Sequence, residues 1–427
     1  MCGITGKVWF DPSRPVSRDL LTRMTDVITH RGPDAAGYYV NGSVGLGHRR
    51  LSIIDLSTGD QPLGNEDDSV QVVFNGEIYN FADIRNILEA RGHRFRTRTD
   101  TEVIVHGFEE WGDRCVDYFR GMFAFALWDN RRRILLLARD RLGVKPLYYA
   151  LLPDGIVFGS EIKSLLEDPD VDRTWDPEAL DAYLTLGYVP APQTIYDAVR
   201  KLDAGHTLQI HGRTPQLRQY WDLRFPGEGD ASREREYLDR TDELLHEAVR
   251  LRMISDVPLG AFLGGGLDST LVVALMRAVS AAEVRTFTIG FEDGSQDEGA
   301  AAAAVARHLG TTHLSLTATE REAQAVVPLL PPIYDEPFAD ASQIPTYLVA
   351  RLTRQHVTVA LSGDGGDELF GGYVNYVRVA EIERWWRLPR AIRAAAAGPA
   401  LLLPHGTRRR ALEGLSAAST RRRSCPR

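Results

Sequence analysis

Apolar residues near the start of the chain recur at the spacing of an amphipathic helix. Leu20, Met24, Val27 and Ile28 fall on one helical face, and Ser17 stands where an N-cap residue is expected. The pattern therefore predicts a helix that packs one face against a core.

A second helix is expected over 81–91, ended by Gly92. The segments before and after this helix have the patterns of strands. Three runs are continuously apolar or alternate with a period of two, and a charged turn, NRRR, joins the last two. These runs are VQVVFNGEIY (71–80), FAFALWD (123–129) and ILLLARD (134–140). The first half of the chain is therefore expected to be strand-rich, of the α+β class.

In the second half the pattern changes to a strict alternation of strand and helix. Such alternation is typical of a doubly wound parallel α/β sheet, in which ligand sites lie at the carboxyl ends of the strands. The alternating segments are 258–263 and 269–279, then 285–291 and 297–310, and finally a helix over 342–354 followed by HVTVAL.

A polar, turn-rich stretch separates the two patterns. With 427 residues the chain is longer than one hydrophobic core usually serves, so two domains are expected. We place the first domain at 2–210, a linker at 211–235 and the second domain at 236–427.

Composition and charge favour a small-molecule enzyme. The chain is 44% hydrophobic and 25% charged, and its net charge of −8 gives no overall attraction to nucleic acid or acidic membranes. The longest mostly apolar stretch, 394–403, is too short to span a bilayer, and the first residues lack the pattern of a secretory signal. We therefore expect a cytoplasmic protein that binds neither nucleic acid nor membranes.

Cys2 is the first candidate for chemistry. The three cysteines are too scattered for a disulfide framework or a closed zinc site. If the initiator methionine is removed, the Cys2 thiol and a free α-amine share one residue. An α-amine titrates near ~7.7–8.0 and can act as a general base, so the nucleophile would carry its own base.

Six further blocks make this first part of the chain recognisable. It resembles the glutamine-hydrolysing asparagine synthetases, whose first domain is a class II glutamine amidotransferase with the N-terminal-nucleophile fold, an αββα sandwich. The blocks are MCGITG at the start, THRGPD (29–34), GHRRLSIIDL (47–56), FNGEIYN (74–80), RTDTE (98–102) and ARDRLGVKPLYY (138–149).

The resemblance implies a role for each residue of a glutamine site. Cys2 would attack the side-chain amide, and Arg50 would clamp the α-carboxylate with its two-pronged guanidinium. The other implied roles are ammonium binding by Glu77 and Asp100, and an oxyanion hole formed by Asn75 and the Gly76 N–H. Taken singly, Arg50 is also typical of a solvated face, Asn-Gly of a hairpin turn, and Asp100 of a helix cap.

A glycine-rich loop, FLGGGLDST (262–270), lies between a predicted strand and helix. Glycines let a backbone approach phosphates, and a helix N-terminus adds free N–H groups, so an anion site is plausible there. The loop lacks the lysine of a Walker A motif. It resembles the S-G-G-x-D-S pyrophosphate loop of the ATP-pyrophosphatases, with Gly264 in place of the serine. The resemblance implies Mg²⁺ at Asp268 and ATP contacts from Leu263, Gly265, Gly266 and Ser269.

A second loop, LSGDGGDELFGGY (361–373), resembles the other ATP loop of the same family. It implies that Ser362, Gly363 and Asp364 contact the nucleotide and that Asp367 binds Mg²⁺. In TFTIGFE (286–292), the Ile289 backbone would hold the adenine.

The resemblance covers nearly all of residues 2–375 and then fails. Members of the family run further, so we expect that this chain lacks a helical segment with a phosphate-contacting lysine. The arginine-rich residues 407–427 are expected to be a solvated tail.

The activity implied is ATP-driven amidation of aspartate. Ammonia released from glutamine at Cys2 would displace AMP from a β-aspartyl-AMP intermediate, with ATP and Mg²⁺ as cofactors and glutamine and aspartate as substrates. A glutaminase with an impaired synthetase half and an amidotransferase for another carboxylate acceptor stay open as alternatives. The oligomeric state is also open, with a homodimer among the alternatives.

Overall fold

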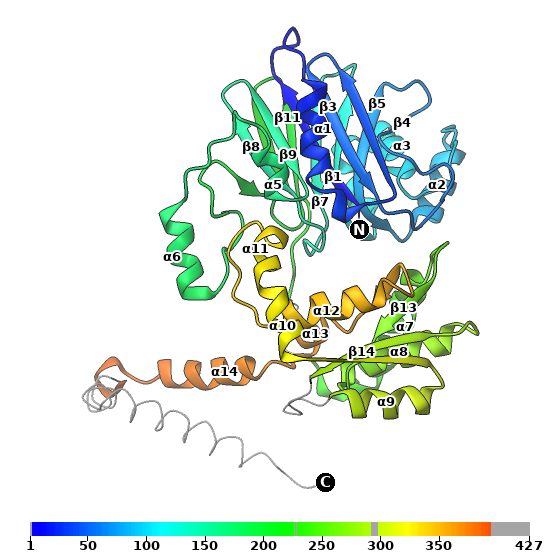
Figure 1. Ribbon diagram of the computed structural model, residues 1–427, viewed down its shortest axis with the longest axis vertical. Helices are drawn as coiled ribbons and strands as arrows, with labels where there is room; N and C mark the ends of the chain where they lie inside the picture. Colours follow the sequence, from blue (N-terminus) through cyan, green and yellow to red (C-terminus); the bar gives the residue numbers. More distant parts are fainter. Residues whose placement is uncertain (1, 226, 228, 292–297, 394–427) are drawn as a thin grey trace. The chain divides into compact units, whose positions relative to one another are not determined.

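A computed structural model describes residues 2–225, 227, 229–291 and 298–393. The chain divides into two compact units, residues 1–362 and residues 363–427. Figure 1 shows the order of the elements along the chain.

Two six-stranded antiparallel sheets form the first part of the larger unit. The first sheet has the order β10-β8-β9-β1-β3-β2, and β1 lies at its centre, paired with β3 and β9. Its strands are β1 (Gly3–Trp9), β2 (Ala35–Asn41), β3 (Val44–Arg50), β8 (Tyr148–Leu152), β9 (Gly155–Gly159) and β10 (Arg200–Lys201).

The second sheet has the order β12-β11-β7-β6-β5-β4, with β5 paired to β6 along its whole length. Its strands are β4 (Leu63–Gly64), β5 (Val70–Ile78), β6 (Gly121–Asp129), β7 (Ile134–Arg139), β11 (His206–His211) and β12 (Thr214–Gln219). These strands confirm the three strand-like runs predicted between residues 71 and 140.

The two sheets pack face to face over one core. Ile4 and Leu46 from the first sheet and Val73 and Leu137 from the second are fully buried in a shared cluster. Helices cover the outer faces, with α1 against β1 and β3, and α3 against β5 (Figure 1). The arrangement is the predicted αββα sandwich. Its helices are α1 (Arg18–Asp26), α2 (Phe81–Ala90), α3 (Glu102–Trp111), α4 (Cys115–Tyr118) and α5 (Ile162–Leu166).

Helix α1 forms for the reasons read from the sequence. The Ser17 hydroxyl accepts a hydrogen bond from the Leu20 N–H at 3.3 Å, which satisfies one of the unpaired donors of the first turn. Leu20 and Met24 are buried in the layer between the helix and the first sheet, and Ile28 is fully buried.

The second part of the larger unit is a four-stranded parallel sheet of order β15-β14-β13-β16. Met276 and Ala306 pack in one core cluster and Phe287 and Val349 in another, so helices contribute to both cores, as a doubly wound sheet requires. The elements are α7 (Glu234–Arg252), β13 (Leu259–Phe262), α8 (Leu267–Val279), β14 (Arg285–Phe291), α9 (Glu298–Leu309), β15 (Thr312–Ala318), α12 (Gln343–Thr353) and β16 (Val359–Leu361).

The runs picked out from the sequence cover only some of the strands. The strands β1, β2, β3, β8, β9 and β11 of the sandwich were not singled out, and neither were the edge strands β12 and β15. β15 (THLSLTA) is an edge strand with polar residues, so its apolar content is too low to signal a strand by itself. β12 falls inside the proposed linker 211–235, where it pairs with β11, and the Arg218 guanidinium donates to the Asp113 carbonyl at 2.7 Å. An edge strand thus takes up the first residues of that segment.

The remaining elements are short. Within the larger unit they are α6 (Pro177–Leu186), α10 (Glu320–Val326), α11 (Leu330–Ile333) and the 3-10 turns Thr29–Arg31, Gly112–Arg114, Ala231–Arg233 and Val327–Leu329. The smaller unit contains α13 (Gly366–Phe370) and α14 (Val374–Trp386).

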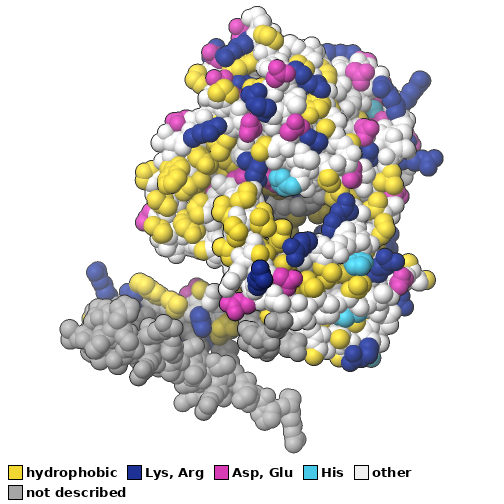
Figure 2. Space-filling model, viewed as in Figure 1, with side chains coloured by type: hydrophobic (Ala, Val, Ile, Leu, Met, Phe, Trp, Pro, Cys, Tyr) yellow, Lys and Arg dark blue, Asp and Glu magenta, His cyan; other side chains and the backbone are white. Residues whose placement is uncertain are grey.

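Apolar side chains lie exposed on α6, whose Leu184 is 73% accessible and is flanked by the exposed Leu180 and Leu186. Figure 2 shows hydrophobic side chains on this part of the surface. Among the described residues, every helix is too short or too polar to cross a bilayer. The predicted apolar stretch 394–403 and the arginine-rich tail lie outside the described residues.

Candidate active site

Cys2 directly precedes the central strand of the first sheet. Its Sγ accepts from the Leu51 N–H at 3.4 Å and lies 3.7 Å from the Leu51 carbonyl oxygen, just beyond the end of β3. Burial raises the pKa of the thiol, while the Leu51 N–H lowers it. The nucleophile predicted from the sequence is therefore a thiol held at the edge of the core, and a base is needed to ionise it near neutral pH.

Asn75 and Gly76 lie in the interior of β5, opposite Ala124 and Phe123 of β6. A hairpin turn at Asn-Gly is therefore excluded. The Asn75 side chain is 0% exposed, and neither its Oδ1 nor its Nδ2 has a hydrogen-bond partner within the described ranges. Buried amides are nearly always paired, so this side chain has donor capacity left for a ligand.

Gly76 is required by the packing of the sheet. A Cβ added there would lie 2.2 Å from the Met122 carbonyl oxygen and 2.7 Å from the Phe123 Cα. Both atoms belong to the backbone of β6 and cannot rotate away. Any side chain at position 76 would therefore push the two strands apart.

Asp100 and Glu77 lie at the end of β5. Asp100 Oδ2 accepts from the Ile78 N–H at 2.8 Å, so the carboxylate is bound to β5. Helix α3 begins after Thr101 and has no side-chain cap, which excludes the capping role for Asp100. Burial raises the pKa of Asp100 to about 6. Burial and the Asp100 charge raise the pKa of Glu77 to about 7.

Arg50 is buried at 5% exposure, so it does not belong to a solvated face. Its Nη1 donates to Asp60 Oδ1 at 2.8 Å, and its Nη2 donates to the Asp55 carbonyl at 2.5 Å. After burial and the Leu51 N–H, the Asp100 charge raises the pKa of the Cys2 thiol and the Arg50 charge lowers it.

The glycine loop follows β13 and leads into α8. The Gly264 N–H donates to Ser269 Oγ at 3.2 Å, and the Thr270 hydroxyl donates to the Gly266 carbonyl at 2.7 Å. A Cβ added at Gly266 would contact nothing within 4 Å, so the backbone is open on that side. Asp268 lies in the first turn of α8. Open backbone at a helix N-terminus fits the predicted pyrophosphate loop.

The neighbouring strands carry other residues expected to bind ATP. Ile289 lies on β14, which pairs with β13 on one side, and β16 pairs with β13 on the other side and ends directly before Ser362. Parallel strands bring their carboxyl ends to one edge of a sheet, so the glycine loop and Ser362 follow the same edge.

Three predicted residues belong to the smaller unit. Gly363 and Asp364 precede α13, and Asp367 lies in its first turn. The Gly372 N–H donates to the Asp367 carbonyl at 3.0 Å, and a Cβ at Gly372 would lie 1.9 Å from Asp367 Oδ1. The second loop therefore folds back on Asp367, and glycine at 372 leaves space for its carboxylate.

Two known families match the chain in sequence. The family described as a glutamine amidotransferase domain matches residues 1–221, and the family described as asparagine synthase matches residues 240–425. The chain is 36% identical over 415 residues to asparagine synthetase [glutamine-hydrolyzing] 1 of Bacillus subtilis, covering 96% of this chain and 65% of that protein. It is 37% identical to a putative asparagine synthetase [glutamine-hydrolyzing] of Methanocaldococcus jannaschii, covering 92% of this chain and 79% of that protein. The chain belongs to the asparagine synthetase family.

The asparagine synthase match reaches residue 425, so the expectation that the resemblance fails after residue 375 is wrong. The match is nevertheless incomplete in the length of the relatives. The chain spans 65% of the Bacillus subtilis synthetase and 62% of a putative synthetase of Mycobacterium tuberculosis, so it has about two thirds of the length of several relatives. The asparagine synthetase family uses ATP.

Two basic residues beside Cys2 were not predicted to have a role. The Arg31 Nε donates to the Cys2 carbonyl at 3.0 Å, and its Nη1 donates to Glu161 at 2.8 Å. Lys145 is buried, and burial lowers its pKa to about 8, although the nearby Glu77 raises it. Both lie in blocks that identified the synthetase family, THRGPD and ARDRLGVKPLYY, so the signal was present but unassigned.

Glu161, the partner of Arg31, also contacts residues that lead to the parallel-sheet part of the larger unit. Burial alone would raise its pKa, but hydrogen bonds from His30, Lys163 and Arg31 lower it to about 2. Lys163 Nζ also pairs with Asp335 Oδ1 at 2.9 Å. An unbroken series of charged contacts thus connects the Cys2 carbonyl with Asp335.

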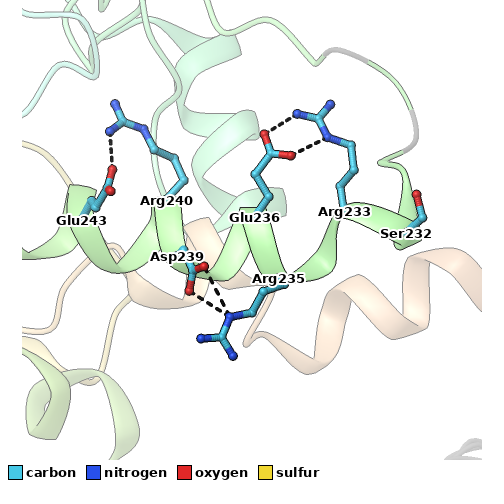
Figure 3. Close-up of a pocket in the computed structure, with 7 residues that line it drawn as sticks. All are labelled: Ser232, Arg233, Arg235, Glu236, Asp239, Arg240 and Glu243. Carbon is cyan, nitrogen blue, oxygen red and sulfur yellow. Dashed lines mark hydrogen bonds and ion pairs between the residues drawn. The ribbon is translucent and has the colours of Figure 1, made fainter.

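A separate hollow on the synthetase surface has no comparable chemistry. Its lining residues lie in the 3-10 turn Ala231–Arg233 and at the start of α7. Their side chains pair with one another, as Figure 3 shows for Arg233 with Glu236 and Arg240 with Glu243. Such pairs are typical of an exposed helical face. We therefore assign no function to this hollow.

Proposed function

We propose that this chain is a glutamine-dependent asparagine synthetase. The observation that carries the proposal is the buried Asn75 amide, which has no hydrogen-bond partner among the described residues. In the same sandwich, the charges of Arg50 and Asp100 act on the Cys2 thiol. The order of the two matching families, amidotransferase then synthase, supports the same activity. We propose domains at 2–210 and 236–427, joined by residues 211–235.

In the amidotransferase half, Cys2 would attack the side-chain amide carbon of glutamine. The thiol gives up its proton to the α-amine of the same residue, and that proton passes to the leaving ammonia. The Asn75 Nδ2 and the Gly76 N–H would stabilise the oxyanion. Asp100 and Glu77 would hold the substrate ammonium, while Arg50 exchanges a carbonyl partner for the α-carboxylate.

In the synthetase half, the carboxylate of aspartate would react with ATP to give β-aspartyl-AMP and pyrophosphate. The proposed nucleotide contacts are those of the two loops and Ile289, and Mg²⁺ would be held by Asp268 and Asp367, because carboxylate oxygens are the ligands it prefers. Ammonia would then displace AMP. The proposed setting is the cytoplasm, with glutamine, ATP and aspartate as its small-molecule substrates.

The test compares the amounts of the three expected products. The chain is incubated with glutamine, ATP, Mg²⁺ and aspartate, and glutamate, asparagine and pyrophosphate are measured together. We expect all three in equal amounts. Glutamate without pyrophosphate would identify a bare glutaminase, and pyrophosphate only with a different carboxylic acid would identify another acceptor. A relative named amidase chyE, 32% identical over 435 residues, justifies including other acids in the screen.

Glutamine binding is expected to weaken in acid. Asp100 and Glu77 bind an ammonium only when ionised, and their pKa values are raised to about 6 and about 7. Affinity should therefore be highest about one pH unit above 7 and fall as the pH drops through 7 and then 6. The fall approaches about tenfold per pH unit for each proton that must be released. Calorimetry on the Cys2→Ala variant measures binding without turnover.

The Glu77→Gln substitution in the same background is the matched control. It removes the group with the higher pKa and leaves Asp100, so the midpoint of the fall should move from near 7 toward 6. An affinity that does not change between pH 8 and about 5.5 would exclude both carboxylates as the ammonium site.

A further inference from the structure

Two histidines and two glutamates converge on one point of the amidotransferase sandwich, away from Cys2. We propose that this sandwich carries a binding site for a divalent transition metal ion, Zn²⁺ by its ligand chemistry, formed by Glu66, His93, His106 and Glu109. Glu66 follows β4, His93 lies between α2 and α3, and the other two residues lie on α3.

The four groups already have nearly the spacing of a tetrahedral site. His106 Nδ1 lies 3.3 Å from Glu109 Oε2 and 3.5 Å from Glu66 Oε2. His93 Nδ1 lies 3.8 Å from Glu109 Oε2 and 3.9 Å from Glu66 Oε1. One ligand atom from each residue falls within 4.8 Å of all the others. Metal bonds of about 2.0–2.1 Å require ligand atoms roughly 3.3 Å apart, so the His–Glu pairs are near this spacing and the wider separations, up to 4.8 Å, must contract when a metal binds.

A further carboxylate lies behind each imidazole, near its second ring nitrogen. Both rings turn Nδ1 toward the centre and Nε2 toward a further carboxylate. His106 Nε2 lies 3.5 Å from Glu102 Oε1, and His93 Nε2 lies 3.7 Å from Glu110 Oε2. A carboxylate behind a metal-bound histidine fixes its ring and its tautomer. At 3.5 and 3.7 Å the two carboxylates stand beyond hydrogen-bond distance, so each would have to close in on its imidazole when a metal binds.

Hydrogen bonds from neighbouring residues also fix the positions of the two proposed carboxylate ligands. The Asn65 Nδ2 donates to Glu109 Oε1 at 2.6 Å, which leaves Oε2 toward the centre. The Arg94 N–H donates to Glu66 Oε1 at 2.9 Å. Because side chains are fixed in this way before a metal binds, little conformational entropy is lost on binding.

Ligand type and charge select the ion. Two neutral imidazoles and two carboxylates offer mixed N and O donors with a charge of −2, which a divalent cation neutralises. Mg²⁺ and Ca²⁺ prefer oxygen ligands alone. His106 is 0% exposed, whereas the Glu66 side chain is 37% exposed and leaves an entrance from solvent.

The metal would have a structural role. It would tie the turn after β4 to α3 and to the segment between α2 and α3. That segment also carries Asp100, so the ion would stabilise the part of the chain next to the candidate ammonium site. This role does not depend on the activity proposed above.

The experiment uses the full chain without a histidine tag, treated with a chelator and then titrated with ZnCl₂ by calorimetry and with CoCl₂ by visible absorption. We expect one equivalent of Zn²⁺ to bind, a higher unfolding temperature with Zn²⁺, and the visible bands of four-coordinate Co²⁺. Thiolate charge-transfer bands should be absent, because the ligands contain no sulfur.

Substitutions inside and outside the cluster show whether Zn²⁺ binds at the proposed site or elsewhere on the chain. His93→Gln should lower Zn²⁺ affinity by at least about 100-fold, because even outer partners of metal ligands contribute roughly 10- to 100-fold. Glu66→Gln tests a partly exposed ligand with little packing to lose. His211→Gln, an exposed histidine at the end of β11, should bind Zn²⁺ like the unaltered chain, and so should Cys2→Ala. The proposal is wrong if Zn²⁺ does not bind, if the cluster variants bind it normally, or if Cys2→Ala abolishes binding.

Discussion

Replacing Cys2 with alanine is expected to abolish glutamine hydrolysis while ammonia-dependent synthesis continues. The substitution removes the attacking sulfur and leaves β1 intact, since Sγ has only weak contacts with Leu51. By comparison with hydrolases that lose their nucleophile, glutamate release should fall on the order of 10⁴- to 10⁶-fold. Asparagine formation from ammonium chloride should keep its rate, because it does not use the Cys2 thiol.

Cys115→Ala is the matched control for this experiment. Cys115 is fully buried on α4, and burial strongly raises the pKa of its thiol, so it is unreactive. Its loss should lower the unfolding temperature through a small cavity but leave glutaminase activity per folded molecule unchanged. Glutamine hydrolysis that survives in Cys2→Ala would show that another group attacks the substrate.

Replacing Asn75 with alanine is expected to lower the glutaminase kcat by about 10²- to 10³-fold, the usual effect of losing one oxyanion donor. The same change should not lower stability. The buried amide has no hydrogen-bond partner in the described part of the chain, and such an unpaired group costs about 1–3 kcal/mol, which offsets the cavity left by its removal.

The separate measurement of kcat and unfolding temperature tests this assignment. A catalytic donor predicts a large loss of kcat with an unchanged unfolding temperature. A structural amide predicts a clear drop in unfolding temperature with glutaminase activity retained by the folded fraction, and that result would exclude Asn75 from the oxyanion hole.

Much of the fold could be predicted because its elements have strong periodic patterns. Helix α1 combines an N-cap at Ser17 with buried Leu20 and Met24, and β6 and β7 are almost wholly apolar because both sheet faces are covered. The edge strands β12 and β15 escaped prediction because their burial is partial and their residues are polar.

The candidate site was predictable only where a residue lies inside a recognisable motif with an assigned role. Arg31 and Lys145 also lie inside recognised motifs. They come near Cys2 only when strands that are distant in the sequence fold together, and their spacing along the sequence does not reveal this. The His93–His106 cluster depends on three separate segments that meet only in the folded sandwich. Sequence spacing indicates a metal site when ligands lie on one local element, and here they do not.

Gly76 changes how relatives of this protein should be compared. Because a Cβ would meet the backbone of β6, glycine at this position is needed for folding whether or not glutamine is hydrolysed. Natural selection would therefore retain Gly76 in a homologue that had lost catalysis, whereas an unpaired Asn75 and a reactive Cys2 would be free to drift. In a family tree, the loss of those two residues beside a retained glycine would mark the branches that have given up glutamine as a nitrogen source.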